Sequence, residues 1–395
     1  MKKIRVFAAI AIAVAIFVLA IRQITPVIVP SPTPTLQSTP SSTPAPPEDR
    51  PLFSTFGWKT DFSKHSVPYS EIFSGGVGKD GIPPIYEPKF ESVPEADVWL
   101  SDGDPVAFLQ SGAQARSYPL RILIWHEIVS DEVSGIPVAM TFCPLCNTVV
   151  VFDRRLEGKV HTFGVSGLLR NSDLIMWDHE TESLWQQATG EAIVGELTGQ
   201  ILDFLPSSIV SWKDFKASFP EGTVLSRNTG YSREYSINPY SGYDTSSFPF
   251  LFTGELDPRL AALERVIGVT IGGESVAYPF SVLAELGVVN DSIGEKRIVI
   301  FFSPGTVSPL DESIIETSRE VGSAAAFYPT VEGQALTFEW SEGQIVDRET
   351  LSSWNIFGKA IAGPSEGQAL ESVVHGTHFW FAWAAFNPDT IIYQP

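Results

Sequence analysis

Residues 127–146 read EIVSDEVSGIPVAMTFCPLC and residues 287–306 read GVVNDSIGEKRIVIFFSPGT, so one β-rich stretch occurs twice along the chain. At a constant offset, each copy follows a Tyr-Pro pair, which begins at Tyr118 and at Tyr278. Runs of β-branched and apolar residues between Gly, Asp and Glu-Gly turns are typical of β-strands. The two stretches therefore predict two similar units built mainly from strands.

Two further blocks repeat in the same order. VFDRRLEGKVHTF, which ends at Phe163, resembles AFYPTVEGQALTF, which ends at Phe338. DHETESLWQQATGEAIVG, which begins at Asp178, resembles DRETLSSWNIFGKAIAG, which begins at Asp347. Similarity of several blocks in the same order indicates an internal repeat.

This repeat determines the predicted fold class. We expect residues 105–255 and residues 256–395 to be two internally duplicated units that share one fold. Apolar residues at helical spacing are confined to short segments, at 118–129 and 212–219, and an insertion at 311–321 belongs to the second unit alone. The predicted class is α+β, predominantly antiparallel β with few helices.

The N-terminus has the layout of an export signal. Three basic residues, the last of them Arg5, precede an uninterrupted apolar stretch at 6–21, and cytoplasmic positive charge places the following chain outside. Residues 1–24 are predicted to be a signal anchor or a cleaved signal peptide. Residues 25–51 are rich in Pro, Ser and Thr, which is typical of a semi-rigid tether. Because a tether needs a fixed end, we favour the anchor.

The predicted location is extracytoplasmic, with the chain tethered to the cell membrane by its N-terminal segment, or secreted if that segment is cleaved. Residues 52–104 are then an N-terminal extension of the folded body. The chain has 46 acidic and 26 basic residues and a net charge of −20, which argues against a nucleic-acid partner. Its two cysteines exclude a disulfide-stapled scaffold.

The first unit carries reactive side chains where the second carries none. Cys143-Pro-Leu-Cys146 occupies the position of Ser303-Pro-Gly-Thr306. The other differences replace a histidine or an acid: His126 and Glu127 match Leu286 and Gly287, His161 matches Leu336, and His179 matches Arg348. The asymmetry is expected if one unit kept a reactive site and the other became a scaffold.

The C-x-x-C motif has three interpretations: two metal ligands, a thiol redox pair, or two structural cysteines. A redox motif of the thioredoxin type begins a helix. The residues after Cys146 read Asn-Thr-Val-Val-Val-Phe, which predicts a strand instead. This context favours a tight turn in which both sulfurs face one metal ion.

Two thiolates need further ligands to hold a metal. The candidates are His126 and His378, and a site of two thiolates with imidazoles suits copper or zinc rather than calcium or magnesium. His375 and His378 are three residues apart, which suits a shared site on a helix or turn. His161, on a predicted strand, and His375 are weaker candidates, because a lone histidine is commonly a hydrogen-bonded core residue. We therefore expect a metal site at Cys143, Cys146, His126 and His378.

Four other residues are candidates for catalytic or substrate-binding roles. Glu127, beside His126, has the chemistry of a general base or of a group that orients a ligand. Arg170, Asn171 and Asp173 lie in a segment, 164–173, that is longer than its counterpart, and they suit an anion or a polar substrate; Asn171 and Asp173 also suit a turn. The tyrosines around NPYSGYD have the character of a sugar-stacking surface, but packing within a loop is the favoured interpretation.

Several long motifs resemble one known family. TFCPLCNT, FGVSGLLRNSDLIMWD, ETESLWQQATGEAIVG, NPYSGYD and HFWFAWAAFNPDT look like those of the prokaryotic domain-of-unknown-function family 3179, from about Tyr118 to the C-terminus. Members usually have glycine where this chain has Asn147. The resemblance implies exported, membrane-associated proteins, and it implies no reaction.

The sequence therefore predicts a membrane-tethered extracytoplasmic metalloprotein that uses its C-P-x-C pair and histidine for metal handling or redox chemistry. Such a protein needs a metal-delivery or thiol-redox partner, and its substrate is unknown. Two alternatives remain open: a metal-free thiol–disulfide oxidoreductase, and a surface module that binds glycans.

Overall fold

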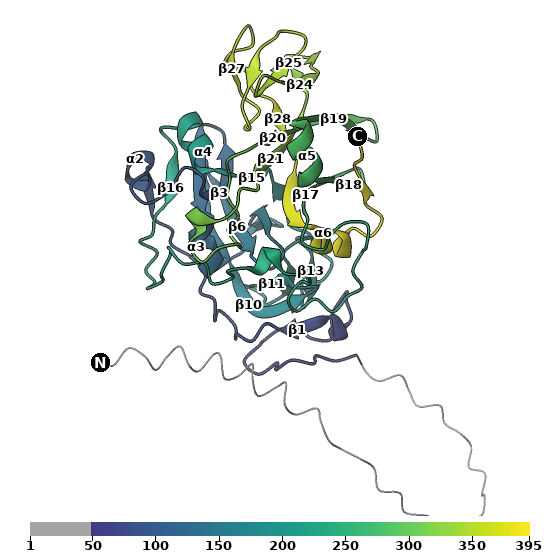
Figure 1. The fold of residues 1–395 in the computed structure, drawn as a ribbon. Helices are drawn as coiled ribbons and strands as arrows, with labels where there is room; N and C mark the ends of the chain where they lie inside the picture. The colour runs from purple at the N-terminus through teal and green to yellow at the C-terminus, as the bar shows by residue number, and fades with distance from the viewer. Residues whose placement is uncertain (1–48) are drawn as a thin grey trace, which may run out of the picture. The chain divides into compact units, whose positions relative to one another are not determined.

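The computed structural model describes residues 49–395 (Figure 1). The predicted signal segment, residues 1–24, and the predicted tether as far as residue 48 lie outside the described residues. Within residues 49–395, no helix is long and apolar enough to cross a membrane. Export and membrane attachment therefore stay predictions.

Antiparallel strands dominate the described chain, as the sequence predicts. Only β16 with β4 and β30 with β18 pair in parallel. The α-helices of residues 49–395 are short: α2 (Val93–Ala96), α3 (Leu120–His126), α4 (Trp212–Ser218), α5 (Phe280–Leu286) and α6 (Trp380–Phe386). The α+β class with few helices is confirmed, although α6 was not expected from its run of aromatic residues.

The largest sheet runs through the middle of the molecule, in the order β30-β18-β17-β29-β7-β6-β5, with β14 paired to β7. Its strands are β5 (Ile128–Val133), β6 (Ile136–Cys143), β7 (Thr148–Asp153), β14 (Phe204–Leu205), β17 (Arg265–Ile271), β18 (Glu274–Pro279), β29 (His375–Phe379) and β30 (Ile391–Ile392). β29 pairs with both β17 and β7. One sheet therefore crosses the predicted boundary between residues 255 and 256.

Two further sheets belong to residues 72–225. One has the order β15-β3-β4-β16-β2 and the other the order β1-β10-β11-β12-β13. The strands are β1 (Ile72–Ser74), β2 (Phe90–Ser92), β3 (Pro105–Ser111), β4 (Gln114–Pro119), β10 (Phe163–Arg170), β11 (Asp173–Asp178), β12 (Leu184–Gln186), β13 (Ala192–Val194), β15 (Ser207–Ser211) and β16 (Thr223–Leu225). A separate hairpin is formed by β8 (Arg155–Leu156) and β9 (Lys159–Val160).

The second half contains two four-stranded sheets, β19-β20-β21-β28 and β24-β25-β26-β27. Figure 1 shows the latter at the top of the view, with β1, β10 and β11 at the bottom. The strands are β19 (Val288–Ile293), β20 (Lys296–Ser303), β21 (Ser323–Tyr328), β24 (Phe338–Ser341), β25 (Gln344–Asp347), β26 (Ser353–Trp354), β27 (Ala360–Ala362) and β28 (Glu371–Ser372). A separate hairpin is formed by β22 (Thr330–Val331) and β23 (Gln334–Ala335).

The two halves have the same order of elements. A hairpin (β3-β4 or β17-β18) leads into a short helix (α3 or α5), which is followed by a second hairpin (β5-β6 or β19-β20). One tyrosine contact also recurs: Tyr118 Oη donates to Asp131 at 2.6 Å and Tyr278 Oη donates to Asp291 at 2.8 Å. The shared order agrees with duplication, but a common origin stays a prediction.

Three local expectations need correction. The segment 164–173 is not a loop: it forms β10, the first residue of β11 and a two-residue turn, Asn171-Ser172, with φ of 51° and 65°. Positive φ at both positions is typical of a type I′ hairpin turn, which matches strand twist. The insertion 311–321 contains only the 3₁₀ turn η3 (Ile315–Thr317). His375 and His378 lie on strand β29 rather than on a helix.

Candidate functional site

The two cysteines lie at the turn between β6 and β7. Cys143 is the last residue of β6 and pairs with Thr148, the first residue of β7. Asn147 closes the turn with φ of 49°, and its N–H donates to Pro144 O at 3.2 Å. Asparagine tolerates this left-handed conformation better than most residues. Both cysteines are free and buried, so the predicted tight turn before a strand is confirmed.

Asp173 is the third member of the group. The sulfurs of Cys143 and Cys146 and a carboxylate oxygen of Asp173 all lie within 4.8 Å of one another. The carboxylate of Asp173 is fully buried, and its Oδ2 accepts from Gln186 Nε2 at 2.5 Å and from Ala188 N at 2.9 Å. Its Oδ1 has no hydrogen-bond partner among residues 49–395. The β10–β11 hairpin therefore delivers an acceptor with a free oxygen to the two thiols.

Glu127 adds a second buried carboxyl group. It follows α3 with φ of 58° and ψ of −34°, and its equivalent in the second half, Gly287, has φ of 70° and ψ of −36°. Only glycine adopts this conformation freely. Burial, and then the negative charge of Asp173, raises the pKa of Glu127 to about 8. A backbone conformation that favours glycine and a buried carboxyl group thus occur together at Glu127.

The thiols share this environment. Burial raises the pKa of Cys143, and Asp173 and Glu127 act in the same direction. The pKa of Cys146 is raised further, first by burial and then by the neighbouring Cys143 and Asp173. Burial also raises the pKa of Asp173, to about 6. No basic side chain of residues 49–395 is among the main influences on these four groups.

The segment 238–252, which we call the covering segment, lies over the cysteines. Tyr243 Oη donates to Leu145 O at 2.9 Å, and Ser172 Oγ donates to Phe250 O. The pKa of Tyr240 is raised, first by its burial and then by Glu127 and Cys143. The motif NPYSGYD is therefore the part of the covering segment that lies over the two cysteines. For the tyrosines around this motif, the sequence favours loop packing over a glycan-stacking surface.

An ion-pair clamp fixes the covering segment to the second half. Asp244 is buried and accepts from Arg265 Nη2 at 2.7 Å, and Arg319 Nη2 lies 3.0 Å from the same oxygen. Ser308 Oγ also donates to this carboxylate. Residues of the second half thus hold the covering segment in place over the thiols of the first half. The second half itself has no cysteine.

His126 does not join the cysteine group. Its Nδ1 must donate to Pro83 O, at 2.6 Å, because a carbonyl oxygen only accepts. Its Nε2 then accepts from Tyr235 Oη, at 2.7 Å. Both ring nitrogens are engaged, and burial lowers the pKa of His126. This hydrogen bonding makes His126 a core residue that anchors Tyr235.

His378 also lies outside the group, although it approaches the cysteine turn. Its Nδ1 lies 2.8 Å from Thr148 Oγ1, which in turn donates to Cys146 O at 3.2 Å. His378 lines a cavity of about 360 Å³ together with Trp383 and His375. Burial lowers its pKa to about 3. The predicted metal set of Cys143, Cys146, His126 and His378 is therefore not assembled among residues 49–395, and Asp173 takes the place expected for histidine.

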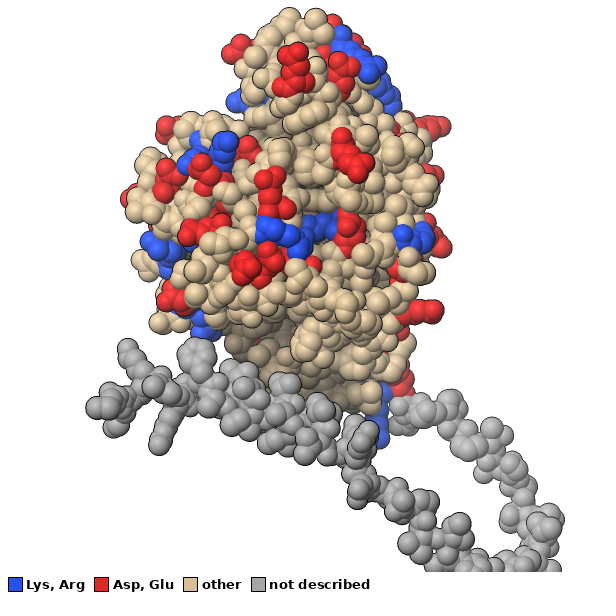
Figure 2. All heavy atoms as spheres, viewed as in Figure 1, with Lys and Arg blue, Asp and Glu red and all other residues tan. Residues whose placement is uncertain are grey.

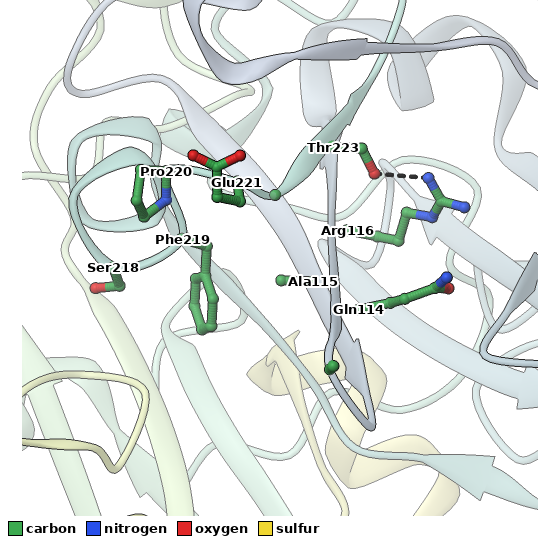
Figure 3. A pocket seen from close by; sticks show the side chains of 10 residues that line it. Gln114, Ala115, Arg116, Ser218, Phe219, Pro220, Glu221 and Thr223 are labelled. Atoms are coloured by element: carbon green, nitrogen blue, oxygen red, sulfur yellow. Dashed lines mark hydrogen bonds between the residues drawn. The ribbon is translucent and has the colours of Figure 1, made fainter. Parts of the chain in front are cut away.

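The remaining candidates have structural partners. Arg170 forms an ion pair with Glu71, with Nη2 2.7 Å from Oε2, and Asn171 forms the hairpin turn. A separate pocket of about 420 Å³ lies beside β4 and the end of α4, where Arg116 Nη1 donates to Thr223 Oγ1 at 2.6 Å (Figure 3). It contains neither cysteine nor histidine, so we assign it none of the chemistry discussed here.

The fold and the site together define a β-rich protein with a buried dithiol–carboxylate centre. The chain belongs to the family described as "Protein of unknown function (DUF3179)", which matches residues 79–390. The resemblance found in the sequence motifs is thereby confirmed. No curated protein and no solved structure matches the chain significantly.

Proposed function

We propose that Cys143, Cys146 and Asp173 bind a divalent metal ion, with Glu127 beside them. The observation that carries this proposal is that two thiols and two carboxyl groups are buried together, with no basic side chain of residues 49–395 among the main influences on them. When several acidic groups are buried without a positive charge nearby, their charged forms are destabilised. A divalent cation that displaces their protons compensates that charge.

The ligand types favour zinc over copper. Zinc accepts mixed sets of thiolate and carboxylate ligands, whereas a soft copper ion prefers sulfur and imidazole. Both thiols lie on one turn and the third ligand comes from a different sheet, so residues far apart in the sequence close the site. Three protein ligands leave a fourth position open, which is the arrangement of a zinc ion that activates a bound molecule.

The proposal also includes the location of the protein and the charge of its surface. The basic and apolar start of the chain and its Pro/Ser/Thr-rich continuation support export and attachment to a membrane. Acidic residues are spread over the face drawn in Figure 2 and favour the approach of cations. The protein would then handle metal outside the cytoplasm and receive it from a metal-delivery partner.

The test replaces the cysteines by the residues of the second half. The full-length chain and a Cys143→Ser/Cys146→Thr variant, which copies Ser303 and Thr306, are reduced and titrated with Co²⁺ in place of Zn²⁺. We expect thiolate-to-cobalt charge-transfer absorption that saturates at one ion per chain in the parent and is absent from the variant. Zn²⁺ should abolish the signal by displacement. A reduced parent chain without this absorption would refute the centre.

Thiol–disulfide exchange is the second candidate, because the two sulfurs are close together and free. A partner disulfide would accept two electrons and two protons as the Cys143–Cys146 disulfide forms. The raised pKa values of both thiols oppose this candidate, since thiolates are the reacting species. A reversible two-electron couple in metal-free protein, together with a missing cobalt signal, would favour it over the metal centre.

A further inference from the structure

A second group of metal-ligating side chains lies away from the cysteines. His161 follows β9, with only 4% of its surface exposed, and its Nδ1 has no hydrogen-bond partner among residues 49–395. Nδ1 lies 3.6 Å from Asp178 Oδ1 and 3.6 Å from Glu180 Oε2. These separations are too long for hydrogen bonds. A buried ring nitrogen thus faces two carboxylates without bonding to either.

The equivalent residues of the second half show that the two carboxylates have structural hydrogen bonds, but they give no such role to the histidine. Asp178 accepts from Trp185 Nε1 at 2.9 Å, and its equivalent, Asp347, accepts from Trp354 Nε1 at 2.9 Å. Glu180 and Glu349 likewise each accept from the backbone N–H of a threonine, at 3.0 and 2.8 Å. The position of His161 is held by Leu336, a core residue. The two carboxylates therefore have the same structural role in both halves, whereas the imidazole is present in the first half alone.

A basic side chain also lies beside the cluster. Arg154 Nη1 donates to the backbone oxygen of His161 at 3.0 Å. Burial lowers the pKa of Arg154, and the charge of Glu180 raises it. The Glu180 side chain is 36% exposed, so the cluster opens to solvent on that side.

We infer that His161, Asp178 and Glu180 form a binding site for a divalent transition-metal ion of the zinc type, separate from the cysteine centre. Ligand atoms around a tetrahedral zinc ion with bonds of about 2.0–2.1 Å lie about 3.3–3.4 Å apart. The observed separations of 3.6 Å approach that spacing; Glu180, which accepts from Thr162 N at 3.0 Å, is the exposed member of the group. One imidazole with two carboxylates suits zinc, whereas magnesium prefers oxygen ligands and water.

The experiment uses the full-length Cys143→Ser/Cys146→Thr chain, so that the cysteine centre contributes nothing. Zn²⁺ binding is measured by calorimetry in this background and after adding His161→Leu, the residue of the second half, or Glu180→Gln. His179→Arg, which copies Arg348, is the matched control. We expect one Zn²⁺ per chain, affinity lowered by about tenfold or more in the first two variants, and no change in the control or in excess Mg²⁺.

Glu180→Gln alters a partly exposed side chain and guards against loss of folding in His161→Leu, which far-ultraviolet circular dichroism checks in each variant. The inference is overturned if the background binds no Zn²⁺, or if folded His161→Leu and Glu180→Gln proteins both bind it as tightly as the background does. Because the thiols are absent throughout, neither outcome bears on the cysteine centre.

Discussion

At Glu127 the backbone and the side chain both act against stability. The residue has φ of 58° where the equivalent position carries glycine, and its carboxyl group is buried beside Asp173. A non-glycine residue in this region costs about 1–2 kcal/mol. The chain thus carries strain and a desolvated acid at one residue next to the thiols, which is how an active or ligand-binding position differs from a scaffold position.

Replacing Glu127 by glycine should therefore stabilise the fold. We expect Glu127→Gly to increase the free energy of unfolding by about 1 kcal/mol, because relief of the positive φ outweighs the extra freedom of the unfolded chain. Chemical denaturation of the reduced, metal-free protein measures the change. Gly287→Ala should have the opposite sign, since a Cβ there meets Trp340 at 2.5 Å. An equal or lower stability of Glu127→Gly would contradict the strain argument.

At the scale of elements, the site depends on segments that meet only in the folded chain. The β6–β7 turn supplies the thiols, the β10–β11 hairpin supplies Asp173, and the covering segment 238–252 closes the space above them. The clamp from Asp244 to Arg265 and Arg319 is itself buried on the aspartate side. Access to the thiols is therefore coupled to an ion pair that neither cysteine touches.

Breaking the clamp should expose the thiols. Asp244→Asn leaves Arg265 buried without its counter-charge, which costs several kcal/mol, and the covering segment should open more often. We expect the native protein to react with a thiol reagent at least about tenfold faster in this variant, as followed by mass spectrometry at Cys143 and Cys146. Glu312→Gln, on the exposed loop beside the segment, serves as the control. Unchanged thiol reactivity in folded Asp244→Asn would show that the clamp does not govern access.

At the scale of the whole molecule, β29 joins the two halves. It pairs with β17 of the second half and with β7 of the first, through Thr377 and Val149. Its histidines also bond across the junction: His375 Nε2 lies 3.0 Å from Ser208 Oγ, and His378 bonds to Thr148. Residues 49–395 accordingly form one compact unit rather than two separate domains.

This junction should make stability depend on pH. Burial lowers the pKa of His375 to about 4 and that of His378 to about 3, both below the ordinary 6.5. Below pH 6.5 the unfolded chain binds more protons at these two histidines than the folded chain does, so the stability that they contribute is complete above that pH and falls as pH decreases toward 4. Glu127 and Asp173, whose pKa values are raised to about 8 and about 6, act in the opposite direction between pH 7 and pH 5. We therefore expect the parent to lose about 2–4 kcal/mol more than a variant without the two histidines over this interval, measured by urea denaturation.

The control for the pH effect is a His375→Gln/His378→Gln double variant, which keeps polar side chains at both positions. The variant keeps Glu127 and Asp173, so the difference between the parent and the variant isolates the contribution of the two histidines. A double variant with the slope of the parent would assign the pH dependence to other groups.

The sequence by itself determined the fold class, the tight turn at Cys143 and Cys146, the positions of α3 and α4, and the family. These features depend on strand-like runs, turn residues and motif spacing. Each of these patterns extends over only a few residues and can be recognised without knowing the fold. The comparison of the two repeats also marked Glu127, Asp173 and His161 as positions worth attention, because each differs from its counterpart or lies in a longer segment.

Only the tertiary structure decided which of these residues meet. His126 and His378 have the chemistry of ligands, but hydrogen bonds to Pro83, Tyr235 and Thr148 determine their roles, and no local pattern encodes partners so distant in the sequence. Asp173 reaches the thiols because the Asn171-Ser172 turn sets the register of β10 and β11. Strand register and sheet packing are set by contacts along the whole chain, and they place a carboxylate where the sequence had suggested an imidazole.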